Sequence, residues 1–208
     1  MVAPELSDAD RARIAEAVRT AEATTSVEIR LVLAHASGHY REYELIYPAM
    51  LALLAGGVMA GVRPALGAGW LFIGEAALFT LAAALLQWPA LRRALVPRPV
   101  KHKAAWRQAR LDYARVGLTS PHTHGVLLLY CSAAERYVEI LVDDVIAEAL
   151  PTAVWSPIVE QFRSRFAAGA VADAFVEAAS GCAAALAPKF PRHAGDANEL
   201  PDGLEEVK

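Results

Sequence analysis

Asp143 ends the apolar segment "YVEILVD" at residues 137–143, and a second carboxylate, Asp144, follows it directly. Ligands of α/β sheets often bind at strand ends, and carboxylate oxygens are the ligands that calcium and magnesium prefer. Such an ion needs several more oxygens, and five other acids are candidates to supply them: Glu28, Glu139, Asp196, Glu199 and Asp202. The pair therefore predicts a calcium or magnesium site, with a solvated turn that caps the next helix as the alternative.

A single acid, Glu75, interrupts the otherwise uncharged stretch "GWLFIGEAALFTLAAALLQW" at residues 69–88. A charge at the centre of a membrane helix costs about 2.5–3.5 kcal/mol on insertion scales, so Glu75 needs a partner or a proton. Arg63 lies in the preceding turn, and its long side chain can reach inward. The alternatives are a protonated Glu75 that bonds to backbone or water, and a membrane helix of a partner protein.

Other reactive side chains give weaker patterns. The histidine pairs, His35 with His39 and His122 with His124, have no cysteine or third ligand nearby, so zinc is not favoured. Cys131 and Cys182 lie in apolar segments and are expected to be small buried thiols. The sequence contains no glycine-rich phosphate loop, nucleophile elbow or Cys-His-acid arrangement. An enzymatic function is therefore less favoured than binding, because activity must be argued from a site.

The apolar residues are concentrated in one part of the chain. Overall, 55% of the 208 residues are hydrophobic and the mean hydropathy is +0.29. Residues 45–62 and 69–88 each approach the length of about 20 residues that crosses a bilayer. Gly57-x-x-x-Gly61 offers a surface on which membrane helices approach closely. We predict a transmembrane helical hairpin. The alternative, a hairpin buried in a soluble protein, would need covering layers on every side, and the rest of the chain already has its own domain to build.

Basic residues are concentrated in the segment that follows this hairpin. Eight follow it: Arg92, Arg93, Arg98, Lys101, Lys103, Arg107, Arg110 and Arg115. Against them stand one acid, Asp112, and a lone Arg63 in the hairpin turn. Lys and Arg mark the cytoplasmic side of a span, so we expect a multi-pass inner-membrane protein with both termini in the cytoplasm. Trp70 and Trp88 suit the two membrane interfaces.

The segments on either side of the hairpin predict one α/β domain. Alternation over residues 26–34 and apolar runs over 125–132 and 137–143 predict strands. Helices are expected over residues 7–23, 101–117 (with Trp106, Ala109, Tyr113 and Val116 on its apolar side), from Pro157 onward, and over 170–187. Residues 1–44 are too few to fold alone. Strand 26–34 should therefore pair into one sheet with 125–132, so residues 1–44 and 89–208 form one domain that residues 45–88 interrupt.

Several segments together carry a family resemblance. They are "LSDADRARIAEAVRTAEATTSVEIRLVLAHAS", "HGVLLLYCSAAERYVEILVDDVIAEALP", "WSPIVEQFRSRFAAGAVADAFVEAASGCAAALAPKFP" and "DANELPD". They resemble the TPM domain family, in particular its bacterial subgroup with a membrane hairpin. The resemblance implies an α/β sandwich, a mixed sheet covered by helices, which the two-helix transmembrane hairpin interrupts here. The family often has Asp-x-Gly at the end of the third strand, where this chain has Asp143 and Asp144 without the glycine.

The resemblance also implies functions. Family members are linked to membrane-protein maintenance, photosystem repair and receptor modulation, and some are ascribed acid phosphatase activity and divalent-cation binding. Our first expectation is a cytoplasmic domain, anchored in the bilayer, that binds a membrane-protein partner during assembly or maintenance. The second is a membrane-anchored phosphatase that depends on a divalent metal at Asp143 and Asp144, and the third is a structural subunit of a membrane complex. A net charge of −3 and a pI of about 6.1 give no reason to expect nucleic acid.

Overall fold

The computed structural model describes residues 5–38, 40–119, 125–193 and 203–207. The chain divides into two compact units, residues 1–37 with 102–208, and residues 38–101. The helices are α1 (Asp8–Glu22), α2 (Tyr43–Val62), α3 (Ala68–Leu86), α4 (Pro89–Leu95), α5 (Arg98–Thr119), α6 (Asp144–Ala149), the 3-10 helix η1 (Thr152–Val154), α7 (Ser156–Ala167) and α8 (Val171–Leu186). The strands are β1 (Glu28–Ala34), β2 (Val126–Ser132), β3 (Tyr137–Val142) and β4 (Leu204–Val207).

The larger unit is built on a mixed sheet with the strand order β3-β2-β1-β4. β1 runs parallel to β2, from Glu28 opposite Val126 to Ala34 opposite Ser132. This confirms the expected pairing of the segments before and after the hairpin. β3 is antiparallel to β2, and β4 is parallel to β1. Every residue of β2 is buried, which explains why its sequence is continuously apolar.

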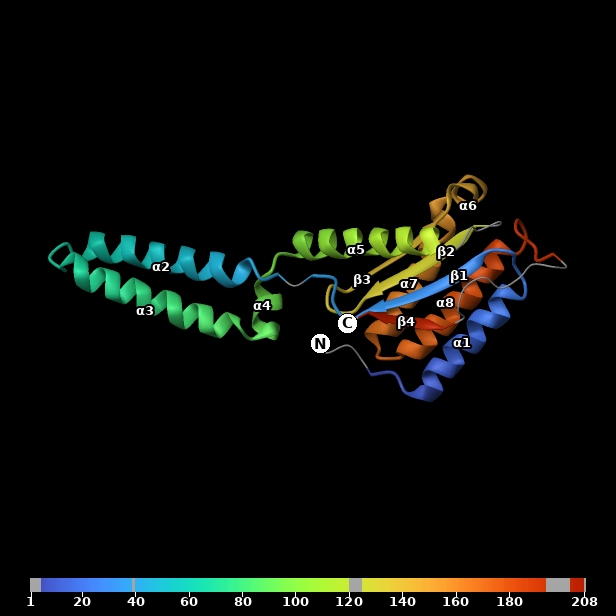
Figure 1. Cartoon of the computed structure of the whole chain (residues 1–208), viewed down its shortest axis with the longest axis horizontal. Coiled ribbons are helices and arrows are strands. Elements are labelled where there is room, and N and C mark those ends of the chain that lie inside the picture. Colours follow the sequence, from blue (N-terminus) through green and yellow to red (C-terminus); the bar gives the residue numbers. More distant parts are fainter. Residues whose placement is uncertain (1–4, 39, 120–124, 194–202, 208) are drawn as a thin grey trace. The chain divides into compact units, whose positions relative to one another are not determined.

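Helices cover both faces of this sheet (Figure 1). On one face, Ile29, Leu31 and Leu33 of β1 join the core that α1, α7 and α8 complete. Its centre includes Phe162 and Phe175, whose rings meet edge to face at 4.9 Å. On the other face, the smaller core beneath α5 includes Val32, Leu128, Tyr130 and Ala109. The fold is therefore the predicted sandwich of a mixed sheet between helices.

Local chemistry fixes the start of α1, and one expectation about α5 was wrong. Ser7 and Asp10 form a capping box at the start of α1. Cys131 and Cys182 are free and buried, as expected. Trp106 does not lie on the buried side of α5: its side chain is 46% exposed, and Ala105 takes the buried position instead. The C-terminal tail adds the edge strand β4, for which the sequence analysis made no prediction.

The smaller unit contains an antiparallel pair of long apolar helices. The buried residues of α2 are Pro48, Ala52 and Gly56, a single stripe at intervals of four residues. The remaining faces of α2 and α3 are exposed: Leu53 and Phe72, for example, are each 70% exposed. Both helices are long and apolar enough to cross a membrane. At the start of α2, Glu44 forms an ion pair with Arg92 of α4.

Candidate functional site

The carboxylate of Asp143 ties the end of β3 to its neighbours. Its Oδ2 accepts a 2.7 Å hydrogen bond from the backbone N–H of Val126, at the start of β2. Its Oδ1 accepts the phenolic O–H of Tyr113 on α5. Burial and this hydrogen bond to the carboxylate raise the pKa of Tyr113, so its phenol stays a donor at neutral pH. Asp143 has a φ of −65°, so this turn needs no glycine.

Of the other acids of the predicted metal site, those that the structure describes form no metal-binding group with Asp143. Asp144 begins α6 and is exposed, while Glu139 forms an ion pair with Arg110 at 3.0 Å. Glu28 of β1 lies opposite Val126 of β2, and Asp143 at the end of β3 lies on the other side of Val126. Glu28 and Asp143 share a face of the sheet, but they are two strands apart, so about 10 Å separates their Cα atoms. Among the described residues, no group of three His, Cys, Asp or Glu side chains is placed to hold a metal. Asp196, Glu199, Asp202, His39, His122 and His124 lie outside the described residues.

A calcium titration tests the Asp143–Asp144 site, which stays a prediction. If the turn binds calcium, a concentration one hundred times Kd stabilises the folded protein by about 2.7 kcal/mol, seen as a higher melting temperature. Asp144→Asn should remove this rise without lowering the melting temperature in the absence of calcium, because Asp144 is exposed. Asp143→Asn is the poorer probe, since it also weakens the bonds to Val126 and Tyr113. An unchanged melting temperature with both calcium and magnesium would refute the site.

A second polar cluster fixes the turn between β2 and β3. The carboxylate of Glu135, which is buried, accepts the backbone N–H of Ser37 at 2.9 Å and the hydroxyl of Ser132. The hydroxyl of Ser37 also lies 2.8 Å from the phenolic oxygen of Tyr130. Burial, with the nearby Asp112 and Glu135 carboxylates, raises the pKa of Tyr130 to about 12, against the opposing effect of its bond to Ser37. These groups hold the turn against the end of β1.

The turn itself is also bonded to the chain that follows β1. Ala133 and Ala134 donate backbone hydrogen bonds of 3.0 and 3.1 Å to the carbonyls of Ala34 and His35. Arg136 closes the turn with a φ of 52°, in the left-handed region that L side chains rarely adopt. A position that strongly favours glycine or asparagine is thus occupied by a long basic side chain.

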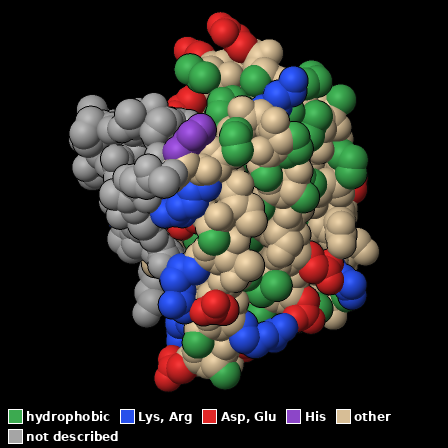
Figure 2. Space-filling view, turned by 90° about the vertical axis from the view of Figure 1, so that its right-hand side faces the viewer, with side chains coloured by type: hydrophobic (Ala, Val, Ile, Leu, Met, Phe, Trp, Pro, Cys, Tyr) green, Lys and Arg blue, Asp and Glu red, His purple; other side chains and the backbone are tan. Residues whose placement is uncertain are grey.

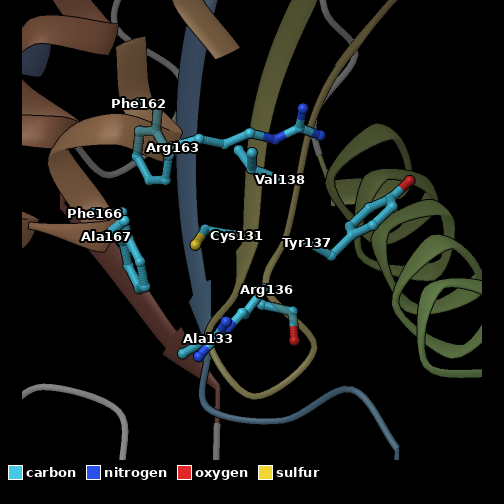
Figure 3. A pocket seen from close by; sticks show the side chains of 10 residues that line it. Cys131, Ala133, Arg136, Tyr137, Val138, Phe162, Arg163, Phe166 and Ala167 are labelled. Atoms are coloured by element: carbon cyan, nitrogen blue, oxygen red, sulfur yellow. The ribbon is translucent and has the colours of Figure 1, made fainter. Parts of the chain in front are cut away.

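Arg136 lines a pocket of about 370 Å³ beside this turn (Figure 3). The apolar walls come from β2, the turn, β3 and α7: Cys131, Ala133, Val138, Phe162, Phe166 and Ala167. Figure 3 shows Arg163 extending from α7 toward Val138, while Tyr137 points away from the other labelled side chains. Sequence reasoning missed this pocket because Phe162 and Phe166, four residues apart on one helix face, are also the pattern of a core helix.

The thiol in this pocket is not a nucleophile at neutral pH. Burial raises the pKa of Cys131, and it raises the pKa of Cys182 to about 12. A cysteine reacts as its thiolate, so both remain protonated. The chemistry available at the pocket is therefore apolar contact with its walls and hydrogen bonding to its arginines.

Glu75 occupies a niche between the two apolar helices. Its carboxylate lies over Gly56, where an added Cβ would be 1.5 Å from Oε1 and 2.9 Å from Cγ of Glu75. The two residues border a pocket together with Met59, Trp70 and other residues of α2 and α3. Arg63 is exposed at the end of α2, and no ion pair joins it to Glu75 among the described residues. Their pairing stays a prediction for the hairpin in a bilayer.

The close approach of α2 and α3 occurs at Gly56 rather than at the predicted Gly57 and Gly61. Nothing lies within 4 Å of a Cβ added at either of those two positions. Gly56→Leu should destabilise the full chain in detergent by about 1–3 kcal/mol, because the new side chain needs the space that Glu75 fills. The loss should largely disappear in a Glu75→Ala background, which vacates that space. Gly57→Leu is the matched control, and an equal loss in that variant would contradict the assignment of the helix contact.

Comparisons with known proteins agree with this architecture. The model of the TPM domain family matches residues 98–185, which run from α5 almost to the end of α8. Among solved structures, the chain is similar to the BA42 protein of the psychrophilic bacterium Bizionia argentinensis, determined by NMR. The two chains share 15% identity over 99% of this chain and 98% of that one, with a TM-score of 0.61, so the likeness concerns the fold. The comparison with curated proteins gives no match.

Proposed function

We propose that this chain, whose residues 98–185 match the TPM domain model, is a membrane-anchored binding protein. In this proposal α2 and α3 cross the inner membrane, and the domain and both termini lie in the cytoplasm. The domain binds a membrane-protein partner and assists its assembly or maintenance. The observation that carries the proposal is the outward-facing apolar surface of α2 and α3.

This surface is unlike that of a water-soluble domain. Leu53, Trp70 and Phe72 are each at least 70% exposed, and most positions outside the α2–α3 contact are apolar as well. Soluble proteins seldom expose continuous apolar surface of this kind. By contrast, Figure 2 shows a face of the molecule on which acidic and basic side chains are interspersed. The exposed apolar side chains of α2 and α3 suit the hydrocarbon core of a bilayer.

The orientation is supported by the basic residues that follow α3. Arg92 and Arg93 lie on α4, and Arg98, Lys101 and Lys103 begin α5, whereas the turn between α2 and α3 has only Arg63. This asymmetry favours a cytoplasmic location for the C-terminal flank of α3. Two spans then return the N-terminal segment to the same side.

Binding is better supported than phosphoryl transfer. Both carboxylate oxygens of Asp143 already accept hydrogen bonds within the domain. A metal ion bound to Asp143 would have to displace Tyr113 or share the carboxylate oxygen that accepts the hydrogen bond of Tyr113. The pocket beside the β2–β3 turn, in contrast, combines apolar walls with two exposed arginines, which suits a ligand. The metal-dependent phosphatase remains the second hypothesis, which the calcium titration tests.

Alkaline extraction of isolated membranes tests the anchoring. The wild-type chain should stay in the membrane pellet at high pH. A chain in which a short Gly/Ser linker replaces residues 45–88 should be soluble without detergent, because the linker removes both candidate spans. As a control, an unrelated two-span hairpin at the same place should return the protein to the pellet. Release of the wild-type chain by alkali would refute the membrane anchor.

A further inference from the structure

The pocket beside the β2–β3 turn lies next to an edge of the sheet. β3 pairs with β2 on one side and is the terminal strand in the order β3-β2-β1-β4, so among the described strands none pairs with its other side. Val138 of β3 lines the pocket, and α7 forms its opposite wall. An edge strand beside a helix is a place where an extended peptide can add as a further strand.

Two guanidinium groups give this pocket its charge. Arg136 forms no ion pair with any described residue. Arg163 pairs with Glu160 at 2.5 Å, but both side chains are about half exposed or more, so the pair contributes little and is easily exchanged. Both guanidinium groups are therefore available to bind an anion. Arginine binds carboxylates through paired hydrogen bonds.

The backbone conformation of Arg136 also supports a binding role for this residue. A side chain in the left-handed region is strained relative to glycine, which adopts this conformation freely. The turn that carries Arg136 is held rigidly by the Glu135 carboxylate and by two backbone bonds from Ala133 and Ala134. Strained residues in rigid surroundings often belong to binding sites. Here the arginine places a cation at the rim of an apolar pocket.

From these observations we propose that β3, α7 and the β2–β3 turn bind the C-terminal end of an extended polypeptide. The last side chain, which is apolar, fills the pocket between Val138, Phe162 and Phe166. The α-carboxylate bonds to Arg136 and Arg163, and the preceding residues pair with the free edge of β3. The inference rests on the proposed binding function and specifies which chemical group that function recognises.

The geometry sets the direction of the bound chain. Arg136 immediately precedes β3, so a carboxylate held there places the C-terminus of the peptide at the beginning of the strand. The peptide must therefore run antiparallel to β3, the arrangement that gives the more stable pairing. A volume of about 370 Å³ lies within the usual range of about 300–1,000 Å³ for small-ligand pockets, and it accommodates a large apolar side chain.

Fluorescence anisotropy with a short labelled peptide tests the proposal. The probe alternates threonine and valine and ends in phenylalanine with a free carboxylate, and the full-length protein is held in detergent. We expect saturable binding that weakens at least about tenfold when the carboxylate is amidated, because hydrogen bonds to charged groups are lost. Arg136→Gly should weaken binding by a similar factor while the melting temperature stays the same or rises, since glycine relieves the strained φ.

A matched arginine on the same helix serves as the control. Arg165 pairs with Glu177 at 2.9 Å and does not line the pocket, so Arg165→Ala should leave the affinity unchanged. Equal binding of the free and amidated peptides, or unchanged affinity in Arg136→Gly, would overturn the proposal. Binding of decanoate but not of the peptide would also overturn it, by assigning the pocket to acyl chains. Alkaline extraction of isolated membranes that contain the same variants, before detergent is added, reports membrane anchoring separately, so the two failures are distinguishable.

Discussion

Residues 89–208, produced without residues 1–44, will not fold into a cooperative domain. The deletion removes α1 and β1, and β1 lies between β2 and β4 in the sheet. Ile29, Leu31, Val32 and Leu33 of this strand are at most 2% exposed. Full burial of each such side chain is worth about 1.5–3 kcal/mol. Their combined loss is comparable with the whole stability of a typical domain, about 5–15 kcal/mol.

The reference for this experiment is residues 1–44 and 89–208 joined by a short Gly/Ser linker. The linked chain should show one cooperative thermal transition by circular dichroism and dispersed amide signals by NMR. The 89–208 fragment should show neither, and adding residues 1–44 as a separate peptide should restore part of the structure. Equal folding of the fragment and the linked chain would show that the N-terminal segment is not part of the domain.

The main elements of this fold were predictable because each depends on a local pattern. Residues 26–34 alternate between apolar and polar, and residues 125–132 form a continuous apolar run, so both segments predict strands and the second predicts a central one. The pairing of these two strands was predictable because residues 1–44 are too few to fold alone and must join the sheet of the following segment. The β4 strand was missed because "LEEV" at residues 204–207 has no distinctive alternation of its own. Its position is set by pairing with β1.

The candidate sites were less predictable because several elements build each of them. The sequence singled out Asp143 as a metal ligand, which stays a prediction, and its contact with Tyr113 depends on where α5 crosses the sheet. In the hairpin, the sequence indicated close packing at Gly57 and Gly61, whereas Gly56 makes the contact with Glu75. Neighbouring residues on a helix differ by about 100° in direction. A glycine pattern therefore does not reveal which of its faces meets the second helix.

Cysteines placed on the hairpin provide a large and direct signal of its environment. The native thiols are unsuitable targets for maleimide, because Cys131 and Cys182 are buried and burial raises the pKa of both. Leu53→Cys and Phe72→Cys instead place a thiol on the exposed sides of α2 and α3. In lipid these thiols do not ionise and a charged maleimide does not reach them, so labelling should be nearly abolished. Ser164→Cys, exposed on α7, is the reference for a position in water.

Labelling these three variants with a membrane-impermeant maleimide, in inside-out vesicles, is the most direct test of the membrane-anchored account. Ser164→Cys should react rapidly there and stay unlabelled in sealed right-side-out vesicles, because in the proposed orientation α7 lies on the cytoplasmic side. Leu53→Cys and Phe72→Cys should stay unlabelled in both preparations until SDS dissolves the membrane. Rapid labelling of Leu53→Cys and Phe72→Cys in intact inside-out vesicles, at the rate of Ser164→Cys, would contradict the account.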